Sequence, residues 1–141
     1  MSGRVHHQPI RIDFAHADMA GIVYFPRLFH FCHVAMEGLV EAAMDMSYAR
    51  FVSERNLGFP TAHTEADYHR PMSYGRHLDL AMTIRRLGTK SVDFRWTVTL
   101  DGDDMPCAEV RSTTVCVNMR EFESRPLPDD VRTAFEPYVE A

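Results

Sequence analysis

The sequence predicts an α+β domain in which one antiparallel sheet wraps around one long helix. Residues 27–46 repeat apolar side chains at the three- and four-residue spacing of a helix with one buried face. Residues 61–119 change to a period of two, which is typical of strands. A strand-like run at residues 10–14 precedes the helix, so the expected order is strand, long helix and then four antiparallel strands.

The long helix begins after Pro26, and at 1.5 Å per residue about twenty residues would extend roughly 30 Å, enough to cross a small sheet. A shorter helix is expected at residues 48–56, with Gly58 in the left-handed conformation that ends it. The predicted buried face of the long helix consists of Leu28, Phe31, Cys32, Ala35, Leu39, Ala42, Ala43 and Met46.

The strands follow from alternation and turn residues. Residues 92–100 alternate most clearly and, with Trp96, are expected in the middle of the sheet. Residues 101–104 have the composition of a hairpin turn. Pro128 starts a short last helix that could dock through Val131, Phe135 and Tyr138. Such a sheet leaves one face and one edge uncovered, so a dimer is expected. The expected strands are residues 61–70, 77–86, 92–100 and 105–119.

Length and composition fit one domain over residues 1–141. The chain is 45% hydrophobic, enough for a real core. No window holds the roughly 18 apolar residues of a membrane span, and the first residues lack the apolar stretch of a secretory signal. We therefore expect a soluble cytoplasmic protein with no membrane partner. The 3 cysteines include no Cys-x-x-Cys pair, so we expect reduced, mostly buried thiols.

The net charge of −5 at pH 7 argues against a nucleic-acid partner, because such proteins usually present a broad basic face. A small anionic ligand remains possible. Arg85, Arg86, Lys90 and Arg95 form a local basic segment, which fits either a polyphosphate tail or a solvated strand edge.

Asp18 lies a few residues before the start of the long helix. At that helix end, unpaired backbone N–H groups and the helix dipole can hold a carbonyl oxygen or oxyanion. A carboxylate there would therefore face a site that polarises an electrophile. An aspartate before a glycine in a loop is also a common turn former, so the local sequence alone leaves both roles open.

Three segments resemble the hot-dog-fold acyl-CoA thioesterases of the 4-hydroxybenzoyl-CoA thioesterase type. They are residues 18–27 (DMAGIVYFPR), residues 66–75 (ADYHRPMSYG) and residues 88–94 (GTKSVDF), and the resemblance extends over about residues 8–120. It implies a hot-dog fold and a homodimer or homotetramer with active sites at the subunit interface. It also implies hydrolysis of an acyl-CoA to the free acid and coenzyme A, with no metal and no cofactor beyond the coenzyme A of the substrate.

The resemblance assigns the catalytic roles to Asp18 and Phe25. Asp18 would attack the thioester carbonyl or activate water, and the sequence does not choose between these routes. The Phe25 backbone N–H would bind the carbonyl oxygen, and Gly21 would let the backbone approach the acyl group. Residues 14, 24, 25 and 29 are aromatic and suit an aryl or short acyl group. The candidate substrate-binding residues are Gly21, Tyr24, His33, His63, Thr64, Lys90 and Ser91, the last two near the coenzyme A chain.

Two positions depart from this pattern. Many relatives carry an acidic residue where this chain has His16, and the aryl branch can carry one where this chain has His33. The role of His16 therefore stays open, and 4-hydroxybenzoyl-CoA itself is in doubt as the substrate. The spacing of His30, His33 and Glu37 is not that of a zinc-binding helix.

Two other functions are compatible with the fold. An acyl-thioester dehydratase or hydratase would need an Asp/His pair, for which His16 with Asp18 is the only hint. A non-catalytic acyl-CoA-binding module would use Asp18 only as a turn residue.

Overall fold

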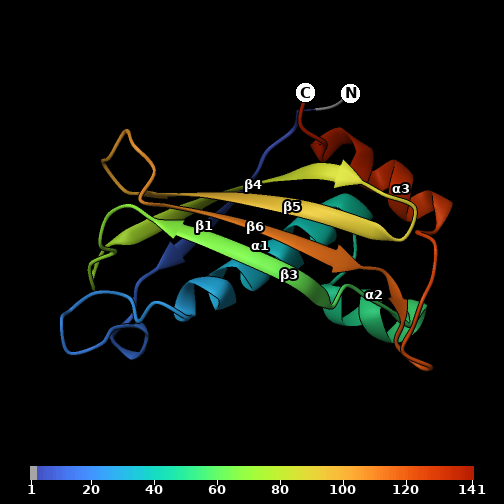
Figure 1. Ribbon diagram of the computed structural model, residues 1–141, viewed down its shortest axis with the longest axis horizontal. Helices are drawn as coiled ribbons and strands as arrows, with labels where there is room; N and C mark the ends of the chain where they lie inside the picture. The colour runs from blue at the N-terminus through green and yellow to red at the C-terminus, as the bar shows by residue number, and fades with distance from the viewer. Residues whose placement is uncertain (1–2) are drawn as a thin grey trace.

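The computed structural model describes residues 3–141, and its centre is a five-stranded antiparallel sheet in the order β1-β4-β5-β6-β3. Helix α1 (Arg27–Met44) crosses one face of this sheet, behind the strands in Figure 1. The predicted α+β arrangement of a sheet around one long helix is confirmed. The strands are β1 (His6–Arg11), β3 (Thr61–Tyr68), β4 (His77–Leu87), β5 (Ser91–Leu100) and β6 (Ala108–Val115).

The remaining elements gather mainly at one end of the sheet. Helices α2 and α3 lie at the right in Figure 1, beside the turn that joins β4 to β5. A small second sheet has the order β2-β7-β8. The bounds are α2 (Tyr48–Arg55), β2 (Leu57–Gly58), β7 (Val117–Asn118), β8 (Glu123–Ser124), α3 (Asp129–Phe135) and the 3₁₀ turns η1 (Phe14–His16) and η2 (Glu136–Tyr138).

The buried face of α1 follows a regular stripe. Its fully buried side chains are Leu28, Phe31, Cys32, Ala35, Met36, Leu39 and Val40. This spacing continues to Ala43, which packs against the core, and passes over Ala42, which is exposed. The prediction that Ala42 is buried was therefore wrong: Ala42 lies at the helical angle of the stripe, between those of Phe31 and Ala35, but it belongs to the last turn of α1, where this side of the helix is not covered.

Two predicted boundaries near the helices need correction. The strand before α1 ends at Arg11, and Phe14 begins η1, with the Asp13 N–H donating to His16 Nδ1 at 2.9 Å. The residue in the left-handed conformation after α2 is Asn56 (φ 52°), not Gly58. Gly58 belongs to β2, where a Cβ atom would collide with the Met119 side chain. The glycine is thus required for close packing and not for a helix stop.

The single strand predicted at residues 105–119 is divided in two. It pairs with β5 and β3 from Ala108 to Val115, and then leaves that sheet at Cys116, whose N–H donates to the Lys90 carbonyl at 2.7 Å. Residues 117–118 pair with β2 instead. The predicted last helix is confirmed at Asp129–Phe135, and its docking side chains Val131, Phe135 and Tyr138 are buried.

The two edges of the main sheet differ. Strand β1 alternates between half-buried and exposed residues beside α1, whereas β3 is exposed along nearly its whole length. The predicted bare edge is therefore β3. The three cysteines are free and buried, as expected. No helix within residues 3–141 is long and apolar enough to cross a membrane.

Candidate active site

Asp18 lies at the tip of a short hairpin that leads into α1. Ala17 pairs with Val23, and the Asp18 N–H donates to the Ile22 carbonyl at 2.9 Å. The tip closes where the Gly21 N–H donates to the Asp18 carbonyl at 3.0 Å. Gly21 has a φ of 77°, and its Cβ would meet no atom within 4 Å. This glycine is required by the backbone conformation of the turn rather than by crowding.

The Asp18 carboxylate is exposed, and within residues 3–141 only one of its two oxygens is hydrogen-bonded. Its Oδ1 accepts the Ala20 N–H at 2.8 Å, which is the Asx-turn bond that such turns use. The other oxygen has no hydrogen-bond or ion-pair partner within residues 3–141. The turn thus holds the side chain in place and leaves one carboxylate oxygen available for chemistry.

Phe25 supplies the unpaired amide at the start of α1. The next N–H groups are occupied, since Arg27 donates to the Tyr24 carbonyl at 2.8 Å and Leu28 to the Phe25 carbonyl at 3.3 Å. Pro26 has no N–H, and within residues 3–141 the Phe25 N–H donates to no acceptor. A free donor at the positive end of an 18-residue helix is suited to bind a carbonyl oxygen that gains negative charge.

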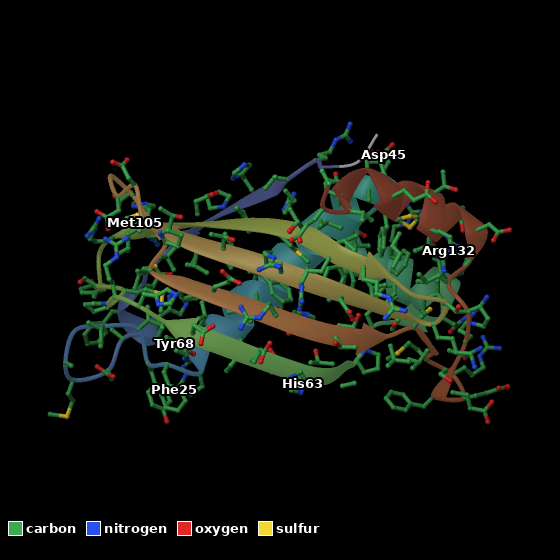
Figure 2. The ribbon with its side chains drawn as sticks, turned by 45° about the horizontal axis from the view of Figure 1, so that its top comes forward. Phe25, Asp45, His63, Tyr68, Met105 and Arg132 are labelled. Atoms are coloured by element: carbon green, nitrogen blue, oxygen red, sulfur yellow. The ribbon has the colours of Figure 1, made fainter. Side chains whose placement is uncertain are left out.

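Tyr68, on the edge strand β3, holds Phe25 in place. Its hydroxyl donates to the Phe25 carbonyl at 2.6 Å, and the two rings meet edge-on with centroids 6.5 Å apart. Figure 2 shows both side chains together at one end of the sheet. Burial, and then the nearby Cys32 thiol, raises the pKa of Tyr68, so the hydroxyl keeps its proton for this bond. Tyr68 was not among the site residues predicted from the sequence, although alternation places it on the same strand face as Thr64.

A cavity of about 240 Å³ lies between α1 and the sheet. Helix α1 contributes Phe29, Cys32, His33 and Met36 to one wall. Phe29 is one helical turn beyond Phe25, so the cavity begins close to the free amide. Burial raises the pKa of the Cys32 thiol, so Cys32 serves as an apolar wall and not as a nucleophile.

The opposite wall carries hydroxyl groups from β3 and β6. They belong to Thr61, Thr64, Ser112 and Thr114. A register shift between Thr61 and His63 lets both threonines of β3 face the cavity. Two sequence candidates, His33 and Thr64, therefore line one cavity. His33 Nε2 lies 2.9 Å from Glu37 Oε2 at its mouth.

His63 lies on the same strand as Thr64 but not in the cavity wall. Because successive side chains of a strand point to opposite faces, His63 faces away from Thr64. It lies close enough to Glu65 to help lower the pKa of the Glu65 carboxyl, although Arg111 has the larger effect on that pKa. Figure 2 shows His63 on the exposed edge strand. Tyr24, another candidate, is exposed beside Phe25, with ring centroids 5.6 Å apart.

The candidates Lys90 and Ser91 lie far from Asp18 within one chain. Lys90 lies in the turn between β4 and β5 and Ser91 begins β5, beside α3, at the end of the sheet opposite the hairpin of residues 16–24 (Figure 1). The Lys90 carbonyl is bonded to the Cys116 N–H, while its side chain is exposed. One chain alone does not bring these residues to the carboxylate.

His16 shapes the turn instead of pairing with Asp18. Its Nδ1 accepts the Asp13 N–H at 2.9 Å, and its ring packs edge-on against Phe31 at 4.9 Å. The Asp/His pair that a dehydratase would need is therefore not formed. Within residues 3–141, no group of three or more His, Cys, Asp or Glu side chains is arranged to hold a metal ion.

Comparison with known proteins finds that this chain is similar to thioesterases in both sequence and structure. The model of the thioesterase-like superfamily matches residues 12–135. A 1,4-dihydroxy-2-naphthoyl-CoA hydrolase from Synechococcus elongatus is 32% identical over 119 residues, which cover 84% of this chain and 85% of that protein. A thioesterase-superfamily structure from Jannaschia sp. CCS1 has a TM-score of 0.90 at 27% identity, covering 100% of this chain and 99% of that one. A 1,4-dihydroxy-2-naphthoyl-CoA thioesterase from Synechocystis has a TM-score of 0.83 at 23% identity, covering 94% and 96%, and so shares the fold.

Proposed function

Because this chain belongs to the thioesterase-like superfamily and is an acyl-CoA thioester hydrolase, we propose that it cleaves an aromatic acyl-CoA to the free acid and coenzyme A, using Asp18 and the Phe25 amide. The observation that carries the assignment of these residues is the unpaired Phe25 N–H at the start of α1, which follows the hairpin that presents Asp18. The hot-dog fold that the resemblance implied agrees with the superfamily match.

The proposed reaction starts with the thioester carbonyl oxygen on the Phe25 N–H. As charge develops on that oxygen, the hydrogen bond strengthens, and such a donor contributes roughly 3 to 4 kcal/mol to the transition state. The free Asp18 oxygen either attacks the carbonyl carbon to form a mixed anhydride, or takes a proton from an attacking water. Both routes expel the coenzyme A thiolate: the second then yields the free acid directly, whereas in the first a water molecule must still hydrolyse the anhydride.

The acyl group occupies the cavity beside α1 in this proposal. The cavity combines apolar and aromatic walls, from Phe29, Met36, Phe94 and others, with a volume of about 240 Å³, which suits a flat ring. Two of the relatives named above, from Synechococcus elongatus and Synechocystis, carry the name of a 1,4-dihydroxy-2-naphthoyl-CoA hydrolase or thioesterase. We therefore propose an aromatic acyl group of one or two rings, with 4-hydroxybenzoyl as one candidate among several.

The site is completed by a second copy of the chain. Strand β3 is a bare edge, and large apolar side chains are exposed at the Asp18 end, including Met19 and Phe25 (61% exposed). Such an edge and patch are typical of an interface. Antiparallel pairing of two β3 strands about a two-fold axis would bring Lys90 of one copy toward Asp18 of the other. A homodimer therefore explains how Lys90 and Ser91 could reach the coenzyme A chain, and a homotetramer would pair two such dimers.

The test is thiol release from a panel of benzoyl-, hydroxybenzoyl-, naphthoyl-, dihydroxynaphthoyl- and short-chain acyl-CoAs. Wild type should release coenzyme A fastest from an aromatic substrate, and Asp18→Asn should lower kcat by about 100-fold or more with unchanged thermal unfolding. Asp104→Asn, in the exposed turn between β5 and β6, is the matched control. Near wild-type turnover by Asp18→Asn would remove Asp18 from the mechanism.

A single turnover in ¹⁸O-water tests the covalent route. If a mixed anhydride is hydrolysed at the protein carbonyl, the label enters the Asp18 carboxylate and one unlabelled Asp18 oxygen passes to the released acid. Activation of water, or hydrolysis of the anhydride at its acyl carbonyl, places the label only in the acid. Label in the Asp18 peptide, measured by mass spectrometry, therefore identifies the anhydride, and its absence excludes attack of water at the protein carbonyl.

A further inference from the structure

Trp96 lines the cavity and carries a buried, unpaired donor. It is the only tryptophan in the chain and is 4% exposed. Its side chain lines the cavity, and its Nε1 has no hydrogen-bond partner within residues 3–141. An indole N–H can only donate, and a buried donor without an acceptor lowers stability. Such a group in a binding cavity indicates that the ligand brings the acceptor.

Ser112 places an acceptor on the same wall. Its hydroxyl donates to Thr64 Oγ1 at 2.7 Å, and Thr64 in turn donates to the Arg111 carbonyl at 3.3 Å. The protons of both hydroxyls are therefore engaged. Ser112 Oγ keeps its lone pairs, so it can accept a hydrogen bond from a ligand but has no proton left to donate.

The sheet register brings these two groups together. Trp96 on β5 is opposite Val110 on β6, and Phe94 is opposite Ser112. Ser112 and Trp96 are thus diagonal neighbours on the face that packs toward α1, where both are buried. Diagonal neighbours lie about 7 Å apart, a separation that one oxygen atom bridges when it accepts from one group and donates to the other.

We propose that Ser112 and Trp96 together select acyl groups that carry a ring hydroxyl. A hydroxyl both accepts and donates, so it satisfies both groups at once. A carboxylate or a ring carbonyl accepts only, and would leave Ser112 unpaired. The only ionisable nitrogen in the cavity wall is that of His33, which is paired with Glu37, so the wall offers no free cation to a buried anion. The inference rests on the proposed function, because it takes this cavity as the acyl site.

The experiment compares kcat/KM for hydroxylated and unsubstituted acyl-CoAs. The pairs are the three hydroxybenzoyl-CoA isomers with benzoyl-CoA, and 1,4-dihydroxy-2-naphthoyl-CoA with 2-naphthoyl-CoA. Wild type should prefer at least one hydroxylated substrate by tenfold or more. Ser112→Ala and Trp96→Phe should each lower kcat/KM for that substrate by about tenfold, and change the unsubstituted partner by less than about threefold.

Thr113→Ala is the matched control, because Thr113 alternates with Ser112 on the same strand and faces away from the cavity. An equal loss on both members of a pair, or no preference in the wild type, would overturn the inference. Thermal unfolding of each variant shows whether an equal loss reflects a damaged core.

A second measurement tests the inference even if no substrate is hydrolysed. Since Trp96 is the sole tryptophan, its fluorescence directly reports a ligand in the cavity. Free hydroxybenzoic and dihydroxynaphthoic acids should bind at least tenfold more tightly than benzoic and 2-naphthoic acids, and Ser112→Ala should remove the difference. Equal affinities would overturn the selection by Ser112 and Trp96, whereas absent thiol release with selective binding would overturn only the proposed hydrolysis.

Discussion

The two ends of the main sheet differ in which polar groups they leave unpaired. At the packed end, formed by α2, α3 and the β4–β5 turn at residues 88–90, every carbonyl of the turn is bonded. Arg132 donates to Gly88 at 2.7 Å, Leu127 to Thr89 at 3.0 Å and Cys116 to Lys90 at 2.7 Å. At the loop end, formed by residues 12–26 and 69–76, the Phe25 N–H and one Asp18 oxygen are unpaired within the described chain.

This difference separates the parts of the chain that provide stability from those that provide chemistry. A turn whose carbonyls are all bonded presents its exposed Lys90 side chain from a rigid support. The loop end instead keeps a donor, a carboxylate oxygen and exposed aromatic side chains available for a substrate and a second subunit. Local rules of folding are commonly relaxed at functional sites.

The largest expected effect comes from combining the two ends in one assembly. Asp18→Asn alone and Lys90→Glu alone should each lower kcat/KM strongly, the first through chemistry and the second by repelling the phosphates of coenzyme A. If each site uses Asp18 of one subunit and Lys90 of the other, mixing and refolding the two variants should restore about a quarter of the wild-type activity. Thiol release before and after refolding is the measurement.

The control for this mixture is Asp18→Asn refolded with the double variant Asp18→Asn/Lys90→Glu, which contains no intact site. It should show no recovery. Failure of the first mixture to recover, with dimers shown by sedimentation, would mean that Lys90 does not serve the partner's site.

A smaller effect is expected from Tyr68→Phe, which removes the hydroxyl that holds the Phe25 carbonyl. Looser placement of the Phe25 amide should lower kcat by about tenfold and leave KM within about threefold, because the bond positions the site without touching the acyl group. Tyr74→Phe, an exposed tyrosine at the same end, should behave as wild type. A change in KM alone would indicate that Tyr68 binds substrate instead.

The sequence predicted the elements well, because their signals are local. The α1 stripe and the alternation of β5 depend on neighbours within a few residues, and both were found. Asp18 and Phe25 came from a contiguous segment that resembles a known family. The boundary at Cys116 was missed because the strand pattern continues there while the pairing partner changes from β5 to β2.

The parts of the site that the sequence did not predict depend on distant pairs. Tyr68 contacts Phe25 across 43 positions in the chain, and no local pattern marks that contact. Trp96 was correctly expected in the middle of the sheet, but its unpaired Nε1 follows only from the three-dimensional packing. His63 and Thr64 were predicted together, whereas strand alternation and the register shift turn only Thr64 into the cavity.

At the packed end, Arg132→Ala should change stability and not chemistry. It removes the donor to Gly88 and the weaker bond to Thr89 at 3.4 Å, so we expect the free energy of unfolding to fall by about 1 to 2 kcal/mol. Urea unfolding measures this loss, and kcat should stay within about twofold. Arg120→Ala, in the exposed turn before β8, is the control, and a large loss of kcat in Arg132→Ala would show that the two ends are coupled.

The smallest expected effect concerns the ion pair between α2 and α3. Arg55 donates to Asp130 at 2.8 Å, and this bond holds the pKa of the Asp130 carboxyl below its usual range. A carboxyl whose pKa is lowered by folding stabilises the protein above the pKa of the unfolded chain, near 3.9, and loses that contribution as the pH falls through the folded pKa. Because the Asp130 side chain is 59% exposed, solvent limits the stabilisation by this ion pair to roughly 0.5 kcal/mol.

Asp130→Asn should therefore be less stable than wild type at pH 7, and the difference in the free energy of urea unfolding should shrink as the pH falls below about 4. Asp129, on the same helical turn, has no arginine partner within residues 3–141, so Asp129→Asn should lose less at pH 7. An equal loss in the two variants would assign the effect to the helix dipole.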